Sequence, residues 1–506
     1  MKNRFLLLVF LPTVVLCVVA FWIRGVLLLD PDFGWHLRIG EIIQRTGIPK
    51  TDPFSYTMPS YPFVDHEWLT NVALSKLYSL VDITGLAIIF SLLATLALLM
   101  QVPFPIKKWS FVPFALVAGS LLYFVGIRPQ IISWVFFSIL IAVLFNSKVW
   151  KWRFTLPLIF IAWANLHGGF GIGLVVLLVV TAMRTWEQKR ILLADTVILL
   201  LCTAFTLINP YGIHLWRELW VQISDTSLRW NISEWRPALF TFSFTFWILV
   251  SISVLTIIRY RKKFYLSQLA LYFILLIAGL SSIRHLPFWL LLILPMTTNS
   301  IAWFAKEAKS YKDGIERLNK AYAIFAVGVV LAVIAEGVVN LEGARSFQEE
   351  TFYPKQAVEF LATQRSCGQL FSTYGWGGYL IWKLPEKKVF IDGRMPSWRW
   401  KSAPHLESNY AFEEYNKVLE GEIPIKHVTA KYNIDTFLLP VGKKRNIPPF
   451  LEKLQERLET SLNRKTDGYR EFIKKIADNG MVEVYKDDTA VIYRQKENSI
   501  RCANPI

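Results

Sequence analysis

Residues 191–210 read ILLADTVILLLCTAFTLINP, and residues 240–258 read FTFSFTFWILVSISVLTII. Both runs are nearly uncharged, and both are about as long as the ~20 residues that a helix needs to cross the ~30 Å hydrocarbon layer of a bilayer. A helix also satisfies its backbone hydrogen bonds internally, as lipid requires. These two runs therefore predict transmembrane helices, and they decide the class of fold.

Similar apolar runs recur along the 506-residue chain, 54% of which is hydrophobic. They predict a polytopic α-helical membrane protein with about eleven transmembrane helices. The expected spans are residues 5–29, 82–101, 111–127, 130–147, 154–166, 169–183, 191–209, 238–258, 265–283, 286–303 and 321–339. The fifth and sixth spans are short and meet at Asn165-Leu166-His167-Gly168-Gly169. They could be two helices or one broken helix.

The net charge of +17 would favour nucleic-acid binding in a soluble protein, but in a membrane protein it reflects loop orientation. We therefore expect membrane lipids as partners and no nucleic acid. One set of alternating loops carries 19 Lys and Arg, whereas the other carries nine before the C-terminal domain. Since basic loops stay in the cytoplasm, we expect a multi-pass plasma-membrane protein with a cytoplasmic N-terminus and its C-terminal domain outside.

The C-terminal third has the pattern of a small α/β domain rather than of membrane spans. It contains a predicted helix at 353–365, short strands at 369–373, 388–391 and 434–439, and a hairpin at 481–493. We expect a transmembrane domain, residues 1–340, with its first outer loop at 30–68, and an extracytoplasmic domain, residues 341–506. Cys367 and Cys502 are the only cysteines of that domain, and an oxidising compartment favours a disulfide between them.

Carboxylates and histidines crowd the first outer loop, where residues 30–38 read DPDFGWHLR and residues 65–69 read DHEWL. Asp, Glu and His clustered beside Trp offer a general base or metal ligands near the lipid headgroups. The alternative is an interfacial cap of belt tryptophans and helix-capping aspartates. We take Asp32 as the main catalytic candidate, supported by Asp30 and Glu67. Asp52, which precedes Pro53, is expected to be a turn residue of little catalytic importance.

The other outer turns place further charged or titratable side chains on the same face. Each alone is as often a headgroup anchor as a functional residue. Together they suggest an outward-facing bowl for an anionic, lipid-borne substrate, because arginine forks bind phosphate and a carboxylate can accept the proton of an attacking hydroxyl. Glu234 joins the catalytic candidates. The expected substrate-binding residues are His36, Arg38, His66, Arg128, His167, Arg284 and His285.

These motifs resemble a known family. DPDFGWHLR at 30–38, followed by DPF at 52–54, resembles the first outer loop of the oligosaccharyltransferase catalytic subunit, a membrane glycosyltransferase of the GT-C fold. ISEWRP at 232–237 resembles the later loop that carries a functional Glu in that family, and Arg284 matches an arginine near the donor pyrophosphate. YGWGGY at 374–379 resembles the family's acceptor-reading tryptophan motif, which adds Trp376 and Tyr379 to the expected substrate-binding residues.

By this resemblance, Asp32 and Glu234 would be the metal ligands, with a divalent cation such as Mg²⁺ or Mn²⁺ as the cofactor. The chain departs from the family at two places. The second-loop acidic pair has no counterpart, since Arg128 stands in that loop, and the Asp of the tryptophan motif is replaced by glycine. The first departure concerns the metal site and the second concerns peptide-sequon recognition, and they indicate a relative with another acceptor. The glycines at 375–379 could instead form a tight strand-to-helix turn with Trp376 as packing.

The resemblance and the topology imply a GT-C-type glycosyltransferase. It would move a sugar from a polyprenyl-phosphate-linked donor to a glycan, lipid or protein acceptor outside the cytoplasm. One alternative is a transporter or flippase of a lipid-linked anion, which would place charges at mid-depth in a repeated architecture, but the sequence shows no repeat. A second alternative is a non-catalytic membrane scaffold that holds partners through its outer domain.

Overall fold

The structure, a computed structural model, describes residues 5–238, 243–364, 367–441 and 468–495. Its internal contacts divide the chain into two compact units. Unit 1 comprises Met1–Asp30 and Val64–Ser346, and unit 2 comprises Pro31–Phe63 and Phe347–Ile506. The sequence groups residues 30–68 with the membrane spans, whereas in the structure residues 31–63 fold with the C-terminal residues.

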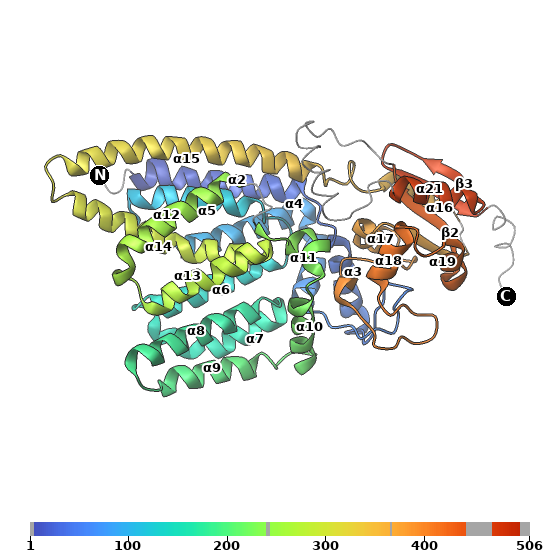
Figure 1. Ribbon diagram of the computed structural model, residues 1–506, viewed down its shortest axis with the longest axis horizontal. Helices are drawn as coiled ribbons and strands as arrows, with labels where there is room; N and C mark the ends of the chain where they lie inside the picture. Colours follow the sequence, from blue (N-terminus) through green and yellow to red (C-terminus); the bar gives the residue numbers. More distant parts are fainter. Residues whose placement is uncertain (1–4, 239–242, 365–366, 442–467, 496–506) are drawn as a thin grey trace. The chain divides into compact units, whose positions relative to one another are not determined.

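Unit 1 is a bundle of helices that run side by side (Figure 1). Its helices are η1 (Leu6–Phe10), α2 (Leu11–Leu27), α4 (Trp68–Met100), α5 (Phe111–Leu122), α6 (Gln130–Phe145), α7 (Leu156–Leu166), α8 (Phe170–Gln188), α9 (Leu193–Phe205), α10 (Ile213–Ser224), α11 (Leu228–Asn231), α12 (Phe244–Tyr260), α13 (Leu266–Ser281), α14 (Leu286–Ala308) and α15 (Gly314–Arg345). Short 3₁₀ turns join several of them: η2 (Lys108–Ser110), η3 (Trp150–Thr155), η4 (Ser233–Trp235), η6 (Arg261–Lys263) and η7 (Ile283–His285).

Six helical segments in the described part of the chain are long and apolar enough to cross a bilayer. They are Leu6–Leu27, Trp68–Met100, Phe170–Gln188, Phe244–Lys263, Ile283–Ala308 and Gly314–Arg345. Four shorter apolar helices are Lys108–Leu122, Gln130–Phe145, Leu193–Phe205 and Leu266–Ser281. Each predicted span coincides with a helix, although the number eleven stays a prediction. The chain is a polytopic helical membrane protein, as the sequence predicts.

The fifth and sixth predicted spans are two separate helices. The first, α7, ends at Leu166, and α8 begins at Phe170. Between them His167 has an extended backbone, with φ −166° and ψ 142°, so the i to i−4 hydrogen-bond ladder is interrupted there. A second irregularity lies at Asp82, whose φ of 57° kinks α4. The predicted span 82–101 matches the part of α4 that follows this kink.

The sides of the helices show which of them lie inside the bundle. Along α14, Leu290, Leu291 and Ile293 are completely buried, as expected for a helix that is apolar all round and enclosed by its neighbours. On α15, by contrast, Ile324 and Leu331 are 75% and 63% exposed. Exposed apolar side chains of this kind are expected on a surface that faces lipid.

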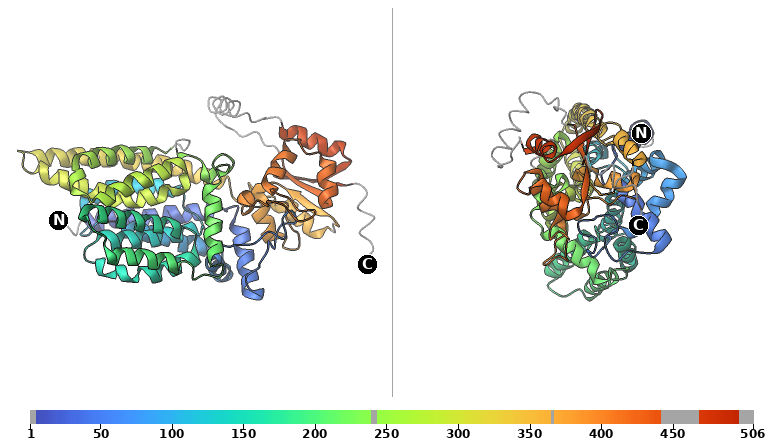
Figure 2. Two further views of the ribbon diagram at one scale, coloured as in Figure 1. Left: turned by 60° about the horizontal axis from the view of Figure 1, so that its bottom comes forward. Right: turned by 90° about the vertical axis from the view of Figure 1, so that its right-hand side faces the viewer.

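Unit 2 is an α/β domain with one four-stranded sheet of order β1-β2-β4-β3. Strands β1 and β2 are parallel, and the other pairs are antiparallel. Its elements are α3 (Phe33–Thr46), α16 (Lys355–Thr363), β1 (Gln369–Ser372), η8 (Tyr374–Trp376), α17 (Gly377–Lys383), η9 (Met395–Ser397), α18 (Ala411–Leu419), α19 (Ile425–Tyr432), β2 (Ile434–Pro440), α21 (Gly468–Asp478), β3 (Met481–Lys486) and β4 (Ala490–Gln495). Figure 2 shows the same ribbon from two further sides.

Most of the strands predicted for this domain are confirmed, but the one at 388–391 is wrong. Val389 forms only an isolated bridge with Ser55, in which the Val389 N–H donates to Phe54 O at 2.9 Å and the Tyr56 N–H donates to Val389 O at 3.1 Å. Its partner is the loop that follows α3, which is too irregular to extend a ladder. The backbone of residues 54–56 therefore occupies the hydrogen-bonding groups that the predicted strand would have used.

Two close contacts explain why residues 31–63 fold with the C-terminal residues. A Cβ on Gly34 of α3 would lie 2.1 Å from the Gly378 carbonyl oxygen of α17. A Cβ on Gly378 would in turn lie 2.1 Å from the Pro31 carbonyl oxygen. These two helices approach so closely that only glycine fits at the crossing.

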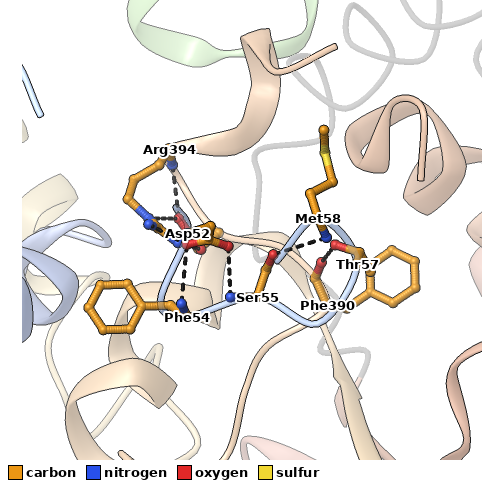
Figure 3. Close-up of polar contacts among 8 residues, drawn as sticks. Asp52, Phe54, Ser55, Thr57, Met58, Phe390 and Arg394 are labelled. Carbon is orange, nitrogen blue, oxygen red and sulfur yellow. Dashed lines mark hydrogen bonds and ion pairs between the residues drawn. The ribbon is translucent and has the colours of Figure 1, made fainter. Parts of the chain in front are cut away.

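A buried ion-pair triad makes the second connection, and Figure 3 labels two of its members, Asp52 and Arg394. Arg394 Nη1 donates to Asp52 Oδ1 at 2.8 Å, and Arg394 Nη2 donates to Asp392 Oδ2 at 2.6 Å. Asp52 also accepts the N–H groups of Phe54 and Ser55, which confirms the predicted turn at Pro53. Burial alone would lower the pKa of Arg394, but the two carboxylates outweigh it and raise that pKa above its usual value. Asp52 therefore ties the loop to the domain as well as shaping the turn.

The disulfide prediction is met at one of its two cysteines. Cys367 of unit 2 is disulfide-bonded, whereas Cys17 and Cys202 of the bundle are free and buried. Cys502, the expected partner, lies outside the described residues.

Candidate functional site

An arginine and two carboxylates meet where three loops of the helical bundle come together. Arg128, in the turn between α5 and α6, forms an ion pair through Nε with Asp30 and through Nη1 with Glu234 Oε1 at 2.8 Å. We call Asp30, Arg128 and Glu234 the arginine cluster. The side chains of Asp30 and Arg128 are 10% and 17% exposed, whereas that of Glu234 is 38% exposed. Glu234 is therefore the member most open to a ligand.

Charge keeps the arginine cluster together. Burial alone would lower the pKa of Arg128, but Asp30 and Glu234 outweigh burial and raise it above its usual value. Arg128 thus stays cationic between its two partners.

Arg24, which the sequence analysis did not single out, holds the turn that carries Arg128. It lies in the last turn of α2, and its guanidinium donates to Val125 O at 3.0 Å and to Tyr123 O at 2.6 Å. Both carbonyls follow the end of α5, where backbone acceptors lack intrahelical partners. The available signal was an arginine inside an otherwise apolar span, since such residues are rare and usually functional or paired.

A second arginine lies next to the same loop. The guanidinium of Arg284 lies over the ring of Trp235, 5.2 Å from its centroid, and the Ile283 N–H donates to Arg236 O at 2.9 Å. Trp235 also meets the ring of His285 edge-on, with centroids 6.1 Å apart. Within the part of the chain that the structure describes, Arg284 forms no ion pair. Its charge is therefore available to an anionic ligand.

A second polar cluster in the same unit contains three predicted residues, Glu67, His66 and His167, and we call it the histidine cluster. The Nε2 atoms of His66 and His167 lie 3.9 Å and 3.7 Å from oxygens of Glu67. The Gly169 N–H donates to His167 Nδ1 at 2.9 Å, and Ser133 Oγ lies 2.8 Å from the same nitrogen. A backbone N–H can only donate, so Nδ1 is an acceptor, and a neutral His167 carries its proton on Nε2, facing Glu67.

Neighbouring hydrogen bonds fix this histidine cluster in the bundle. Asp65 accepts from Asn71 Nδ2 at 2.8 Å and from the Glu67 N–H at 3.0 Å. Trp68 Nε1 donates to Asn165 Oδ1 at 3.0 Å. The polar break between α7 and α8 therefore packs against the residues that open α4. This agrees with the rule that irregular backbone at membrane depth is tolerated beside protein or a wet cavity.

Three residues of the first outer loop, Asp32, His36 and Arg38, belong to unit 2. Asp32 directly precedes α3, and a Cβ on Gly393 would lie 1.8 Å from Asp32 Oδ1. Position 393 must therefore remain glycine for the Asp32 carboxylate to keep its place. His36 is buried against Trp35, with ring centroids 3.8 Å apart, and Arg38 forms an ion pair with Glu41.

The structure places Trp376 and Tyr379 in the core of unit 2. They are 3% and 2% exposed. Trp376 Nε1 donates to Phe352 O at 2.9 Å, and the Tyr379 hydroxyl donates to Glu349 Oε1 at 2.8 Å. Their polar atoms thus have internal partners, which favours the packing interpretation of the 375–379 turn.

The metal prediction rests on Asp32 and Glu234, which belong to different units. Over the described ranges, no group of three or more His, Cys, Asp or Glu side chains is arranged to hold a metal ion. In the arginine cluster, Arg128 pairs with both carboxylates, so a divalent cation there would face a positive charge. The divalent cation therefore stays a prediction from the sequence, and we derive no metal-dependent step.

The chain matches no protein-family model, and no curated protein is significantly similar to it in sequence. Several solved structures are similar in architecture. The oligosaccharyltransferase of Archaeoglobus fulgidus in the apo form is 12% identical, with a TM-score of 0.48 over 85% of this chain and 69% of that one. ArnT from Cupriavidus metallidurans, bound to undecaprenyl phosphate, is 14% identical, with a TM-score of 0.45 over 98% of this chain and 99% of that one.

At identities of 12% and 14% and TM-scores below 0.5, this likeness concerns general architecture. The activity has to be inferred from the chain's own residues.

Proposed function

We propose that this protein is a GT-C-type glycosyltransferase that moves a sugar from a polyprenyl-phosphate-linked donor to an acceptor outside the cytoplasm. The observation that carries the proposal is Arg284. It is an arginine without an ion pair among the described residues, and it lies over Trp235, next to Glu234 of the arginine cluster. A cation beside carboxylates at the ends of membrane helices suits the phosphate of a lipid-linked donor.

In the proposed reaction, a hydroxyl oxygen of the acceptor attacks the anomeric carbon of the donor sugar. The bond between that carbon and the phosphate oxygen breaks, and its electron pair leaves with the polyprenyl phosphate. Arg284 would stabilise the negative charge that develops on the phosphate. A carboxylate accepts the hydroxyl proton, and Asp32 is our proposed base, with Glu234, Asp30 and Glu67 as the other candidates. His36, Arg38, His66, His167 and His285 are proposed to orient the substrates.

The proposed topology places the loops of the arginine cluster outside the cytoplasm and the basic loops inside it. This follows from the 19-to-nine distribution of Lys and Arg between the two sets of loops. Reporter fusions after Arg190 and after Ile506 test the proposal. We expect a cytoplasmic signal from the first fusion and an extracytoplasmic signal from the second. Cytoplasmic signals from both would contradict the topology.

The first test of the activity is binding of undecaprenyl phosphate to the purified protein in lipid nanodiscs. Arg284→Gln should weaken binding by about tenfold or more, because a hydrogen bond to a charged group contributes about 1.5–3 kcal/mol. The matched control is Arg259→Gln. Arg259 is 64% exposed, pairs with Glu307 and lies in the last turn of α12, next to a basic loop of the opposite set. Equal binding by both variants would refute the role of Arg284.

The second test separates a transferase from the alternatives. Detergent-solubilised protein is incubated with polyprenyl-phosphate sugars and envelope extract, and transferred sugar is measured by mass spectrometry. A transferase works without a sealed membrane, whereas a transporter or flippase produces no product under these conditions. We expect transfer by the wild type and by Arg259→Gln and a much lower yield from Arg284→Gln. No product from any form, together with an unchanged envelope glycan profile in a strain lacking the protein, would favour a scaffold.

A further inference from the structure

Helix α10, Ile213–Ser224, is oriented differently from the bundle to which it belongs. It runs crosswise at the ends of α7, α8 and α9 (Figures 1 and 2). At 12 residues it would be about 18 Å long, which is too short to span a bilayer. Its orientation and length are those of a helix that lies along a membrane surface rather than one that crosses it.

One side of α10 is attached to the bundle. Leu215 is 1% exposed, and a Cβ on Gly168 would lie 2.7 Å from Leu219 Cδ2 and 2.9 Å from His66 Cδ2. Trp216 Nε1 donates to Thr206 Oγ1 at 3.0 Å. The helix therefore rests directly on the turn between α7 and α8, beside the histidine cluster.

A second side of α10 is apolar and faces away from the protein. Ile213, Trp220 and Ile223 are 64%, 70% and 58% exposed. At ~100° per residue these three positions fall within an arc of about 80° on the helix. Large apolar side chains gathered on one exposed arc require a partner that is itself apolar on that side.

A third side of α10 is polar. His214, Arg217 and Ser224 are exposed and fall within a neighbouring arc of about 80°, which also includes the half-buried Val221. The helix thus has a protein side, an apolar side and a polar side in sequence around its axis. A headgroup boundary, where hydrocarbon and water meet, offers both of the environments that the two exposed arcs need.

The exposed apolar surface of α9 continues into α10. Leu200 of α9 is 63% exposed, and Leu207 and Ile208, which follow α9, are 43% and 53% exposed. Ile213 begins α10 only five residues later. Because the exposed side of an apolar membrane helix faces lipid, the continuation of that surface favours lipid over a second protein as the partner of α10.

We propose that α10 is an interfacial helix that inserts its Ile213, Trp220 and Ile223 side into the headgroup–acyl boundary at this end of the bundle. The bilayer surface is its partner. A helix of this kind buries its apolar face ~5–10 Å into the boundary. Because Leu219 rests on Gly168 and His66, α10 then fixes the histidine cluster at headgroup depth, where the phosphate of a lipid would lie.

The test measures the depth of single labelled positions on α10. Starting from a Cys17→Ala, Cys202→Ala background, Trp220→Cys and Ile223→Cys probe the apolar side, and His214→Cys and Ser224→Cys are the matched controls on the polar side. Each variant is labelled with bimane and reconstituted at one copy per nanodisc of phosphatidylethanolamine and phosphatidylglycerol, with lipids brominated near the top of the acyl chain. We expect bromolipid to quench the label at 220 and 223 strongly and the label at 214 and 224 weakly.

Equal quenching on the two sides, or weak quenching at all four positions, would overturn the proposal. Weak bromolipid quenching at 220 combined with quenching between labelled copies in larger vesicles would assign the apolar side to a second copy instead. A second variant, Ile213→Glu, is read through the label at Ile223→Cys. Because a charge on the apolar side disfavours insertion, we expect it to reduce the bromolipid quenching, and unchanged quenching would contradict the proposal.

Discussion

Replacing Arg394 by methionine should release the first outer loop from the domain that holds it. Arg394 is surrounded by aromatic rings, with its guanidinium 4.8 Å from the Phe54 centroid and 5.1 Å from that of Trp398. Methionine keeps much of the length of the side chain and removes the charge. The variant therefore tests the ion pairs with Asp52 and Asp392 rather than the packing around them.

The size of the effect follows from burial. The side chain of Arg394 is 4% exposed, and those of Asp52 and Asp392 are completely buried. Removing one partner of a buried ion pair costs about 3–5 kcal/mol, because the remaining charge is left without compensation. At ~1.4 kcal/mol per factor of ten, local opening of the loop should become roughly 100-fold to a few thousand-fold more frequent.

Hydrogen exchange followed by mass spectrometry, on the whole protein in nanodiscs, measures this opening directly. Peptides covering residues 51–63 and 389–398 should lose protection, whereas peptides of α14 should not. The matched control is Arg345→Met, since Arg345 is 57% exposed and pairs with Glu342 at the surface. Such an exposed pair contributes only about 0–1 kcal/mol.

Combining Arg394→Met with Asp52→Asn and Asp392→Asn should restore part of the protection, because no buried charge then remains unpaired. Unchanged protection in Arg394→Met alone would refute the reasoning. It would mean that the close contact between α3 and α17 holds the loop without the triad.

Three further outcomes are expected. Asp32→Asn should lower sugar transfer by about 100-fold or more in the detergent assay, with normal insertion and hydrogen exchange, and a wild-type rate would remove Asp32 from the mechanism. Gly378→Ala should lower the protection of α3 in hydrogen exchange, because its Cβ would lie 2.1 Å from a backbone carbonyl, and unchanged protection would show that this crossing can relax. Burial alone would raise the pKa of Glu349, but hydrogen bonds from Tyr379 and Lys383 outweigh it and lower that pKa. The stabilisation of the folded state by ionised Glu349 is therefore complete above the unfolded pKa of ~4.3 and is lost as the pH falls through the lower folded value. A Glu349→Gln variant, followed by tryptophan fluorescence during a pH titration, should not show this loss.

The helices were the most predictable part of the fold. The sequence of residues 191–209 alone predicts a helix, because a segment that crosses the bilayer must be an uninterrupted apolar helix irrespective of its tertiary contacts. The break at residues 165–169 was visible because polar residues interrupt the apolar sequence there. In the structure α7 ends at Leu166 and α8 begins at Phe170. The predicted strand at 388–391 failed because its pairing partner is the loop after α3, which local periodicity does not reveal.

The sequence showed which types of residue form the candidate site, but it did not show which of them pair with one another. Arg128, Glu234 and Asp30 were each visible as charges in outer loops, and the structure joins them in one cluster. Arg24 was hidden inside a span, where its role depends on the carbonyls of another helix. Asp52 showed its turn in the sequence, but its ion pair with Arg394 was not foreseeable, since tertiary contacts are not encoded in local spacing.

The separation of Asp52 from Arg394 by 342 residues affects how the protein is made. At ~5–20 residues per second, the ribosome needs about 20–70 s to reach Arg394 after it has added Asp52. Throughout that interval the first outer loop has no domain to fold into, and its aromatic and acidic side chains stay exposed while the spans are inserted. The nascent chain is therefore vulnerable to proteases and to misassociation for about a minute, and a chain that terminates before residue 394 never leaves that state.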